Sequence, residues 1–265
     1  MLRPACVVAL LTIQPLLAQE VEDDGSYNML FSAGLGRFAG DYGEEEDTTL
    51  DVLSLNARRY FTRGEVQLSV PYLSVDGDGV TLVDGRPVEV PGGATAGGQG
   101  KESGLGDIVV RGEYYLRTGT STSPWVIALL RVKLPTGNDD RGLGTGATDV
   151  EAGVGWIRRH GPVNWLADIG YTFVGGSGGF DPKNVWRMGA GLSVPFGMDE
   201  RNNTYAYLEN RTNRFGDSED RRSLAVGVGT SLDDARRMRV SASAFFGLSD
   251  TAEDWGLYLT LGYRH

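Results

Sequence analysis

Charged side chains at alternating positions are the residues of this sequence best placed to do chemistry. In one stretch, Ile108, Val110 and Tyr114 alternate with Arg111 and Glu113. Charges of both signs on one face can select solutes in a polar passage, and they can also pair with each other and close that passage. Both interpretations stay open. The candidate residues for this polar face are Arg58, Arg111, Glu113, Arg117, Arg131, Lys133, Asp149, Glu151, Asp168, Arg187, Glu209, Arg211, Arg237 and Arg239.

The sequence offers little for catalysis. The chain has 2 histidines, His160 beside a tight turn at Gly161 and His265 at the terminus, and neither is placed to activate a serine inside a sheet. The Gly-rich stretch 142–146 is followed by another alternating segment, whereas a phosphate loop needs a helix and a lysine at set spacing. We therefore predict no enzyme, no catalytic residue, no cofactor and no metal site. A membrane hydrolase built on His160 is kept as an alternative.

The N-terminal residues 1–18 have the pattern of a secretory signal peptide. Arg3 supplies the positive start, residues 5–17 form a short apolar core, and Ala18 precedes a polar segment. The chain has 1 cysteine, Cys6, which lies inside this stretch, so a mature chain from residue 19 would contain no thiol. We predict cleavage after residue 18 and one domain over 19–265, exported to the outer membrane of a Gram-negative cell.

After the signal, short segments with a period of two dominate the chain, as expected for strands with one apolar face. Each has about the length that a tilted membrane strand needs. This pattern predicts an all-β fold, an antiparallel up-and-down transmembrane β-barrel of about twelve strands. The predicted strands are 26–37, 48–61, 64–74, 105–118, 124–134, 147–160, 162–175, 184–197, 203–215, 221–231, 235–248 and 254–264.

The connections alternate in length along the chain. Links after even-numbered strands are tight, as at 62–63 and 161, whereas the links after odd-numbered strands include every long one, such as 75–104 and 135–146. Short periplasmic turns and longer extracellular loops are typical of outer-membrane barrels. A soluble β-sandwich, the structural alternative, would have no reason to alternate loop lengths in this way.

Aromatic residues near the strand ends further distinguish a membrane barrel from a soluble β-sandwich. Trp and Tyr favour the boundary between lipid tails and headgroups, so a membrane barrel should have an aromatic girdle at each end. We expect the periplasmic girdle at Trp125, Trp156, Trp165, Phe196 and Tyr263, and the extracellular girdle at Tyr72, Phe173, Trp186, Phe246 and Trp255.

The 75–104 loop is a second candidate functional element. Residues 80–83 and 88–90 flank Asp84-Gly85, which predicts a β-hairpin, and residues 91–104 are Gly-rich. The hairpin could fold inward as a constriction or point outward as a contact surface.

The formal net charge of −10 argues against nucleic-acid binding, which requires a concentrated basic face. The partners we expect are outer-membrane lipid, the barrel-assembly machinery and a small-molecule solute, with the protein acting as a monomer.

Three segments resemble a known family when they are taken in order. They are Ser103-Gly-Leu-Gly-Asp107, Lys133-Leu-Pro-Thr-Gly137, and Gly142-Leu-Gly-Thr-Gly146 followed by Asp149. This order is similar to that of the MetA-pathway phenol-degradation family of outer-membrane barrels, and residues 165–175 resemble the strand that follows. The resemblance implies a barrel that admits hydrophobic or aromatic compounds. We expect the three motifs to shape loops at the extracellular rim.

The sequence thus leads to a channel or transporter for small solutes in the outer membrane, with porin-like architecture. The alternative is a closed structural barrel that acts as an anchor or surface contact through the 75–104 loop.

Overall fold

The computed structural model describes residues 28–42, 47–77, 80–83, 86–89, 100–120, 122–176, 182–197, 201–214 and 219–265, with only the backbone for 80–83 and 86–89. The signal peptide predicted at 1–18 lies outside the described residues. Among the described residues, no helix is long and apolar enough to span a membrane.

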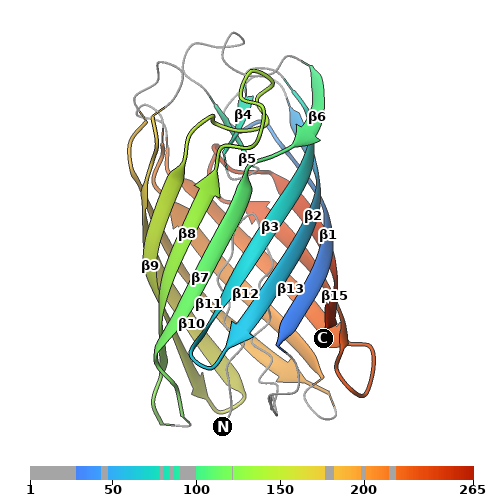
Figure 1. The fold of residues 1–265 in the computed structure, drawn as a ribbon, viewed down its shortest axis with the longest axis vertical. Coiled ribbons are helices and arrows are strands. Elements are labelled where there is room, and N and C mark those ends of the chain that lie inside the picture. The colour runs from blue at the N-terminus through green and yellow to red at the C-terminus, as the bar shows by residue number, and fades with distance from the viewer. Residues whose placement is uncertain are drawn as a thin grey trace.

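A single antiparallel sheet of 13 strands closes into a barrel (Figure 1). Twelve strands make up the wall, and the short β6 extends one side of it. The wall strands are β1 (Met29–Gly40), β2 (Thr48–Phe61), β3 (Gly64–Asp76), β7 (Ile108–Arg117), β8 (Trp125–Leu134), β9 (Asp149–His160), β10 (Val163–Phe173), β11 (Val185–Phe196), β12 (Asn202–Arg211), β13 (Arg221–Ser231), β14 (Met238–Gly247) and β15 (Trp255–Arg264). The predicted fold and all twelve predicted strands are confirmed.

The first and last strands close the barrel. β1 pairs with β15 in a continuous antiparallel register from Leu30 opposite Arg264 to Ala39 opposite Trp255. Closure leaves no wall strand with an unpaired edge, which a sheet surrounded by lipid requires.

The two ends of the barrel differ in the length of their connections. At one end, the turn end, lie two-residue links such as 62–63 and 161–162, the start of β1 and the end of β15. The opposite end, the loop end, has the long connections 77–107, 135–148 and 174–184. Successive strands therefore run up and down as the alternation in loop length predicted (Figure 1).

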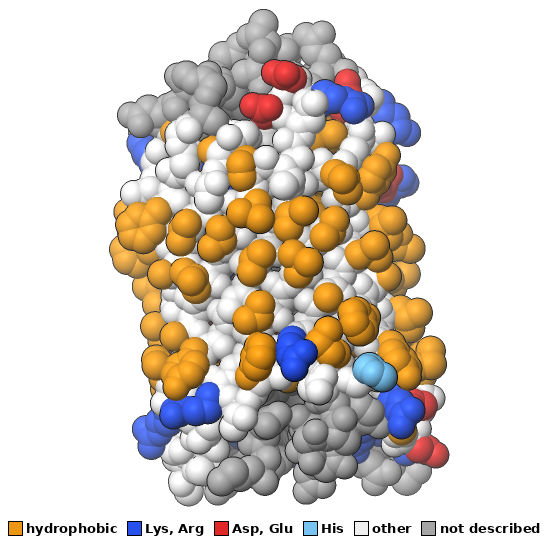
Figure 2. Space-filling model, in the orientation of Figure 1, with side chains coloured by type: hydrophobic (Ala, Val, Ile, Leu, Met, Phe, Trp, Pro, Cys, Tyr) orange, Lys and Arg blue, Asp and Glu red, His pale blue; other side chains and the backbone are white. Residues whose placement is uncertain are grey.

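The burial of side chains alternates along the wall strands, most regularly in β15. In β15, Trp255, Leu257 and Leu259 are exposed, whereas Tyr258 and Thr260 between them are buried. On the face shown in Figure 2, apolar side chains form a broad band across the barrel, and charged side chains lie mainly above and below it. Such a band is what a lipid bilayer requires of the outer surface of a barrel.

The wall deviates from the prediction between β3 and β7. The sequence suggested one strand over 105–118 after a Gly-rich segment, but β6 (Lys101–Leu105) already pairs with the end of β3. Tyr72 lies opposite Leu105 and Ser69 lies opposite Val109, so two residues of β3 face three residues of its partner. This extra residue is a β-bulge, and it breaks the strand at 106–107.

The hairpin predicted within the 75–104 loop is present. β4 (Val80–Val83) pairs antiparallel with β5 (Arg86–Glu89), with Val83 opposite Arg86. Its turn at Asp84-Gly85 and the Gly-rich residues 90–99 lie outside the described residues.

The start of β3 requires a residue without a side chain. Gly64 lies where β3 meets β7, opposite Tyr114, and a Cβ atom at this position would overlap the carbonyl oxygen of Glu113. Because that oxygen belongs to the β7 backbone, it cannot move aside as a flexible side chain would.

We expect Gly64→Ala to lower the free energy of unfolding by about 1–3 kcal/mol, the usual cost of overpacking. Urea titration of the refolded barrel in detergent measures this. Gly176→Ala is the matched control, because a Cβ there meets no atom within 4 Å. Equal stability of the two variants would contradict this account.

Candidate functional site: the barrel interior

The loop-end half of the interior contains a connected network of buried ion pairs. Lys133 on β8 is fully buried, and its Nζ lies 2.9 Å from Oδ2 of Asp107 and 3.4 Å from Oδ2 of Asp149. Arg214, which follows β12, places Nη2 2.6 Å from the same oxygen of Asp149. A buried charge is costly unless it is paired, so this network holds its members together.

A second group of ion pairs continues around the wall. Glu151 on β9 accepts a hydrogen bond of 2.8 Å from Nε of Arg187 and lies 3.6 Å from Nη1 of Arg131. Arg187 also pairs with Asp168, which in turn accepts a hydrogen bond from the hydroxyl of Tyr207. Strands β8 to β12 are thus linked through their inward side chains.

The three sequence motifs meet at Asp107. Its Oδ1 accepts a hydrogen bond of 2.9 Å from the backbone N–H of Gly137, and its Oδ2 accepts one of 3.4 Å from the backbone N–H of Thr145. A Cβ on Gly144 would lie 2.6 Å from this carboxylate, so a side chain there would displace it. The motifs therefore form one structural unit that fixes the 135–148 loop over the start of β7.

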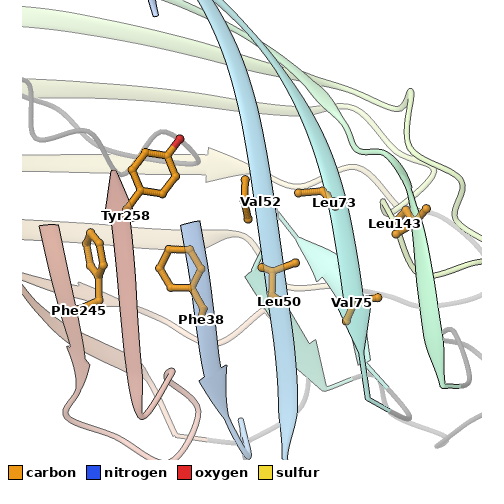
Figure 3. Close-up of a cluster of buried hydrophobic side chains, with 8 residues drawn as sticks. All are labelled: Phe38, Leu50, Val52, Leu73, Val75, Leu143, Phe245 and Tyr258. Atoms are coloured by element: carbon orange, nitrogen blue, oxygen red, sulfur yellow. The ribbon is translucent and has the colours of Figure 1, made fainter. Parts of the chain in front are cut away.

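One wall of the interior near the loop end is apolar. The buried side chains come from the adjacent strands β14, β15, β1, β2 and β3, and they lie in a row along the inner surface (Figure 3). Leu143 joins them from the 135–148 loop. We call this surface the apolar wall; its members are Phe38, Leu50, Val52, Leu73, Val75, Leu143, Phe245 and Tyr258.

The turn-end half of the interior has the opposite arrangement. Its polar side chains lie on β2 and β3, where Nη1 of Arg58 is 2.8 Å from Oε1 of Glu65 and Nε of Arg58 donates to Gln67 at 2.9 Å. Its apolar cluster lies on β7 to β10 and contains Tyr115, Ile127, Ile157, Leu166 and Trp125. We call this cluster the aromatic patch.

Most of the predicted polar-face residues point inward. Buried or partly buried interior positions hold Arg58, Arg111, Glu113, Arg131, Lys133, Asp149, Glu151, Asp168, Arg187, Glu209, Arg211 and Arg239. The placement of Arg117 and Arg237 differs from the expectation, because both are exposed. The register of β7 shifts between Tyr115 and Arg117, and Arg237 lies in the turn before β14 begins.

The expected girdle residues lie on the outer surface with one exception. Near the turn end, Trp156, Trp165, Phe196 and Tyr263 face outward; near the loop end, so do Tyr72, Phe173, Trp186, Phe246 and Trp255. Trp125 instead points inward, with its ring 5.7 Å from that of Tyr115 in an edge-to-face arrangement. Trp125 shares the inward period of Ile127 and Leu129, so the alternation of β8 was sufficient to place it.

Several interior residues were missing from the predicted set. Asp107 lies just before β7 but shares the inward period of Arg111 and Glu113, so the alternation was a usable signal. Arg214 lies beyond the end of β12, where no period applies. Glu65 directly follows a turn, but its alternation with Gln67 along β3 was a usable signal. Among the described residues, no group of three or more His, Cys, Asp or Glu is arranged to hold a metal ion.

Comparison with known proteins identifies a matching family and several barrels of similar fold. Residues 48–265 match the family described as "Putative MetA-pathway of phenol degradation". Among solved structures, the COG4313 outer membrane channel from Pseudomonas putida F1 is 13% identical with a TM-score of 0.71, over 92% of this chain and 100% of that one.

Two further structures share the barrel at lower similarity. The translocator domain of the autotransporter NalP from Neisseria meningitidis is 9% identical with a TM-score of 0.55, over 92% of this chain and 90% of that one. The NanC porin is 7% identical with a TM-score of 0.54, over 89% and 100%. No curated protein matches the sequence. At these identities the structures support the fold, and they include both porins and a translocator.

Asp107→Asn should release the 135–148 loop, because a neutral amide no longer pairs with Lys133 and cannot accept from both Gly137 and Thr145 in the same way. We expect faster hydrogen–deuterium exchange across 135–148 while the wall strands stay protected. Asp140→Asn is the control, since Asp140 is an exposed residue of the same loop. Unchanged exchange in Asp107→Asn would show that other contacts hold the loop.

Proposed function

The chain belongs to the MetA-pathway phenol-degradation family, and we propose that it is an outer-membrane channel for small apolar solutes, aromatic compounds among them. We place the loop end on the outside of the cell and the turn end in the periplasm, as in other outer-membrane barrels.

The apolar wall is the observation that carries this proposal. Lipid contact explains apolar side chains on the outside of a barrel, but Phe38, Leu50 and Phe245 lie inside and are at most 6% exposed. An aqueous pore for hydrated ions has no need of such a surface. An apolar solute that has left water gains about 25 cal/mol for each Å² of apolar contact, so the wall offers it a favourable path.

The charged side of the interior favours the same conclusion. Lys133, Glu151 and Arg187 are buried and already paired, so they cannot serve as successive binding sites for hydrated ions. We expect this pairing to keep bulk water out of the interior, which leaves the apolar wall as the surface that a solute follows.

The wall itself can be tested by changing one side chain without changing its size greatly. We expect Phe245→Gln to slow the uptake of radiolabelled phenol by roughly tenfold, because about 1–2 kcal/mol of apolar contact is replaced by a buried amide. Phe245→Leu keeps an apolar surface and should retain most of the uptake.

Uptake would be measured in a porin-deficient Gram-negative host, with equal amounts of heat-modifiable barrel in the outer membrane. Equal phenol uptake by cells with and without the protein would contradict the proposed function.

An interior closed by paired charges, as proposed here, predicts the electrical behaviour of the protein. We expect little steady current in a planar bilayer from the intact protein, and also after deletion of residues 78–99, because the closing ion pairs belong to the wall and the 135–148 loop. Current that appears only after the deletion would make the 75–104 loop the gate. Absence of both current and phenol uptake would favour the alternative of a closed barrel that acts as a surface contact.

A further inference from the structure

A group of arginines lies on the inner surface at the turn end. Arg58 on β2 and Arg264 on β15 both pair with Leu30 of the strand between them, and all three side chains are buried and point inward. Neighbouring strands are about 4.8 Å apart, so the Cα atoms of the two arginines are roughly 10 Å apart. Arg239 on β14 pairs with Gly262, two residues before Arg264, which makes it a diagonal neighbour.

The carboxylates at this level are already engaged. Glu65 pairs with Arg58 at 2.8 Å, and Glu113 pairs with Arg111. Arg264 is 7% exposed, forms no ion pair with any residue that the structure describes, and its Nε has no hydrogen-bond partner there. The buried hydroxyl of Tyr60, which also points inward from β2, has none either. A buried cation and an unsatisfied donor are costly, so an anion bound at this surface would be stabilised.

The aromatic patch faces Arg264 and Arg239 across the lumen. In the order of the strands around the barrel, β8 and β9 lie five to six positions from β14 and β15, which is nearly the opposite side. The patch residues Trp125, Ile127 and Ile157 occupy the turn-end part of their strands, as Arg58 and Arg264 do. A solute at this level would therefore meet an apolar surface on one side and guanidinium groups on the other.

We propose that the turn end of the lumen is a binding site for small aromatic monoanions, of which benzoate is the simplest. The carboxylate binds Arg264, with Arg239, Arg58 and the hydroxyl of Tyr60 around it, and the ring lies toward the aromatic patch. A guanidinium group can hold a carboxylate through two parallel hydrogen bonds, which gives such a site both affinity and orientation. The inference rests on the proposed function only in treating the lumen as the path of the solute.

The test is equilibrium dialysis of the refolded full chain in detergent with radiolabelled benzoate, and in parallel with benzyl alcohol, after subtraction of binding to protein-free micelles. We expect Arg264→Gln to weaken benzoate binding by about tenfold or more, since a charge-assisted hydrogen bond of at least 1.4 kcal/mol is lost, and to leave benzyl alcohol binding nearly unchanged. Arg264→Lys should recover part of the benzoate affinity, whereas Trp125→Leu should weaken the binding of both compounds.

Arg59→Gln is the matched control, because Arg59 follows Arg58 on the same strand but is exposed on the outer surface. If Arg264→Gln does not give a heat-modifiable barrel, Arg239→Gln carries the same expectation.

Failure of the wild-type protein to bind benzoate, or equal effects of Arg264→Gln on benzoate and benzyl alcohol, would overturn the inference. Phenol uptake separates the inference from the proposed function. Phenol uptake without benzoate binding would support the channel and contradict the anion site. Benzoate binding without phenol uptake would support the anion site and contradict the channel.

Discussion

The constraint on which the rest of the structure depends is that a charge inside this barrel can be satisfied only by other groups inside it. Lipid surrounds the wall, so a side chain such as Arg187 or Lys133 cannot turn outward to water. Each must find carboxylates inside the barrel. Arg187 pairs with Asp168 on the neighbouring strand and with Glu151, and Lys133 pairs with Asp149 on the neighbouring strand and with Asp107. Because the pairs join different strands, the requirement for charge balance also ties together the register of β7 to β12 and the position of the 135–148 loop.

The interior divides into two levels in which the apolar and charged sides exchange places. Near the loop end, the apolar side lies on β14 to β3 and the ion pairs lie on β7 to β12. Near the turn end, the apolar side lies on β7 to β10, and the polar side lies on β2, β3, β14 and β15. A solute that kept apolar contact throughout would have to cross the lumen between the two levels. The tyrosines Tyr205 and Tyr207 on β12 form a separate small cluster between these regions.

The period of two was sufficient to predict the fold, because strands with a lipid face and an interior face have no freedom to break it. For the same reason the inward position of Arg131, Glu151 and Arg187 could be predicted from β8, β9 and β11 alone. The predictions went wrong where the period stops. The register of β7 shifts before Arg117, Arg237 lies in the turn before β14, and Arg214 lies beyond a strand end. Contacts between such positions depend on how the loops close, and no local pattern encodes that closure.

The attachment of the 135–148 loop to Asp107 limits how this sequence can change over evolutionary time. Gly137 and Thr145 reach the two oxygens of one carboxylate from opposite halves of the same loop. Adding or removing a residue between them would move one N–H out of hydrogen-bonding distance of the carboxylate. The number of residues between Gly137 and Thr145 is therefore constrained. Descendants of this gene can lengthen their other outer loops to suit a new environment, while this one must evolve by exchange of side chains at constant length.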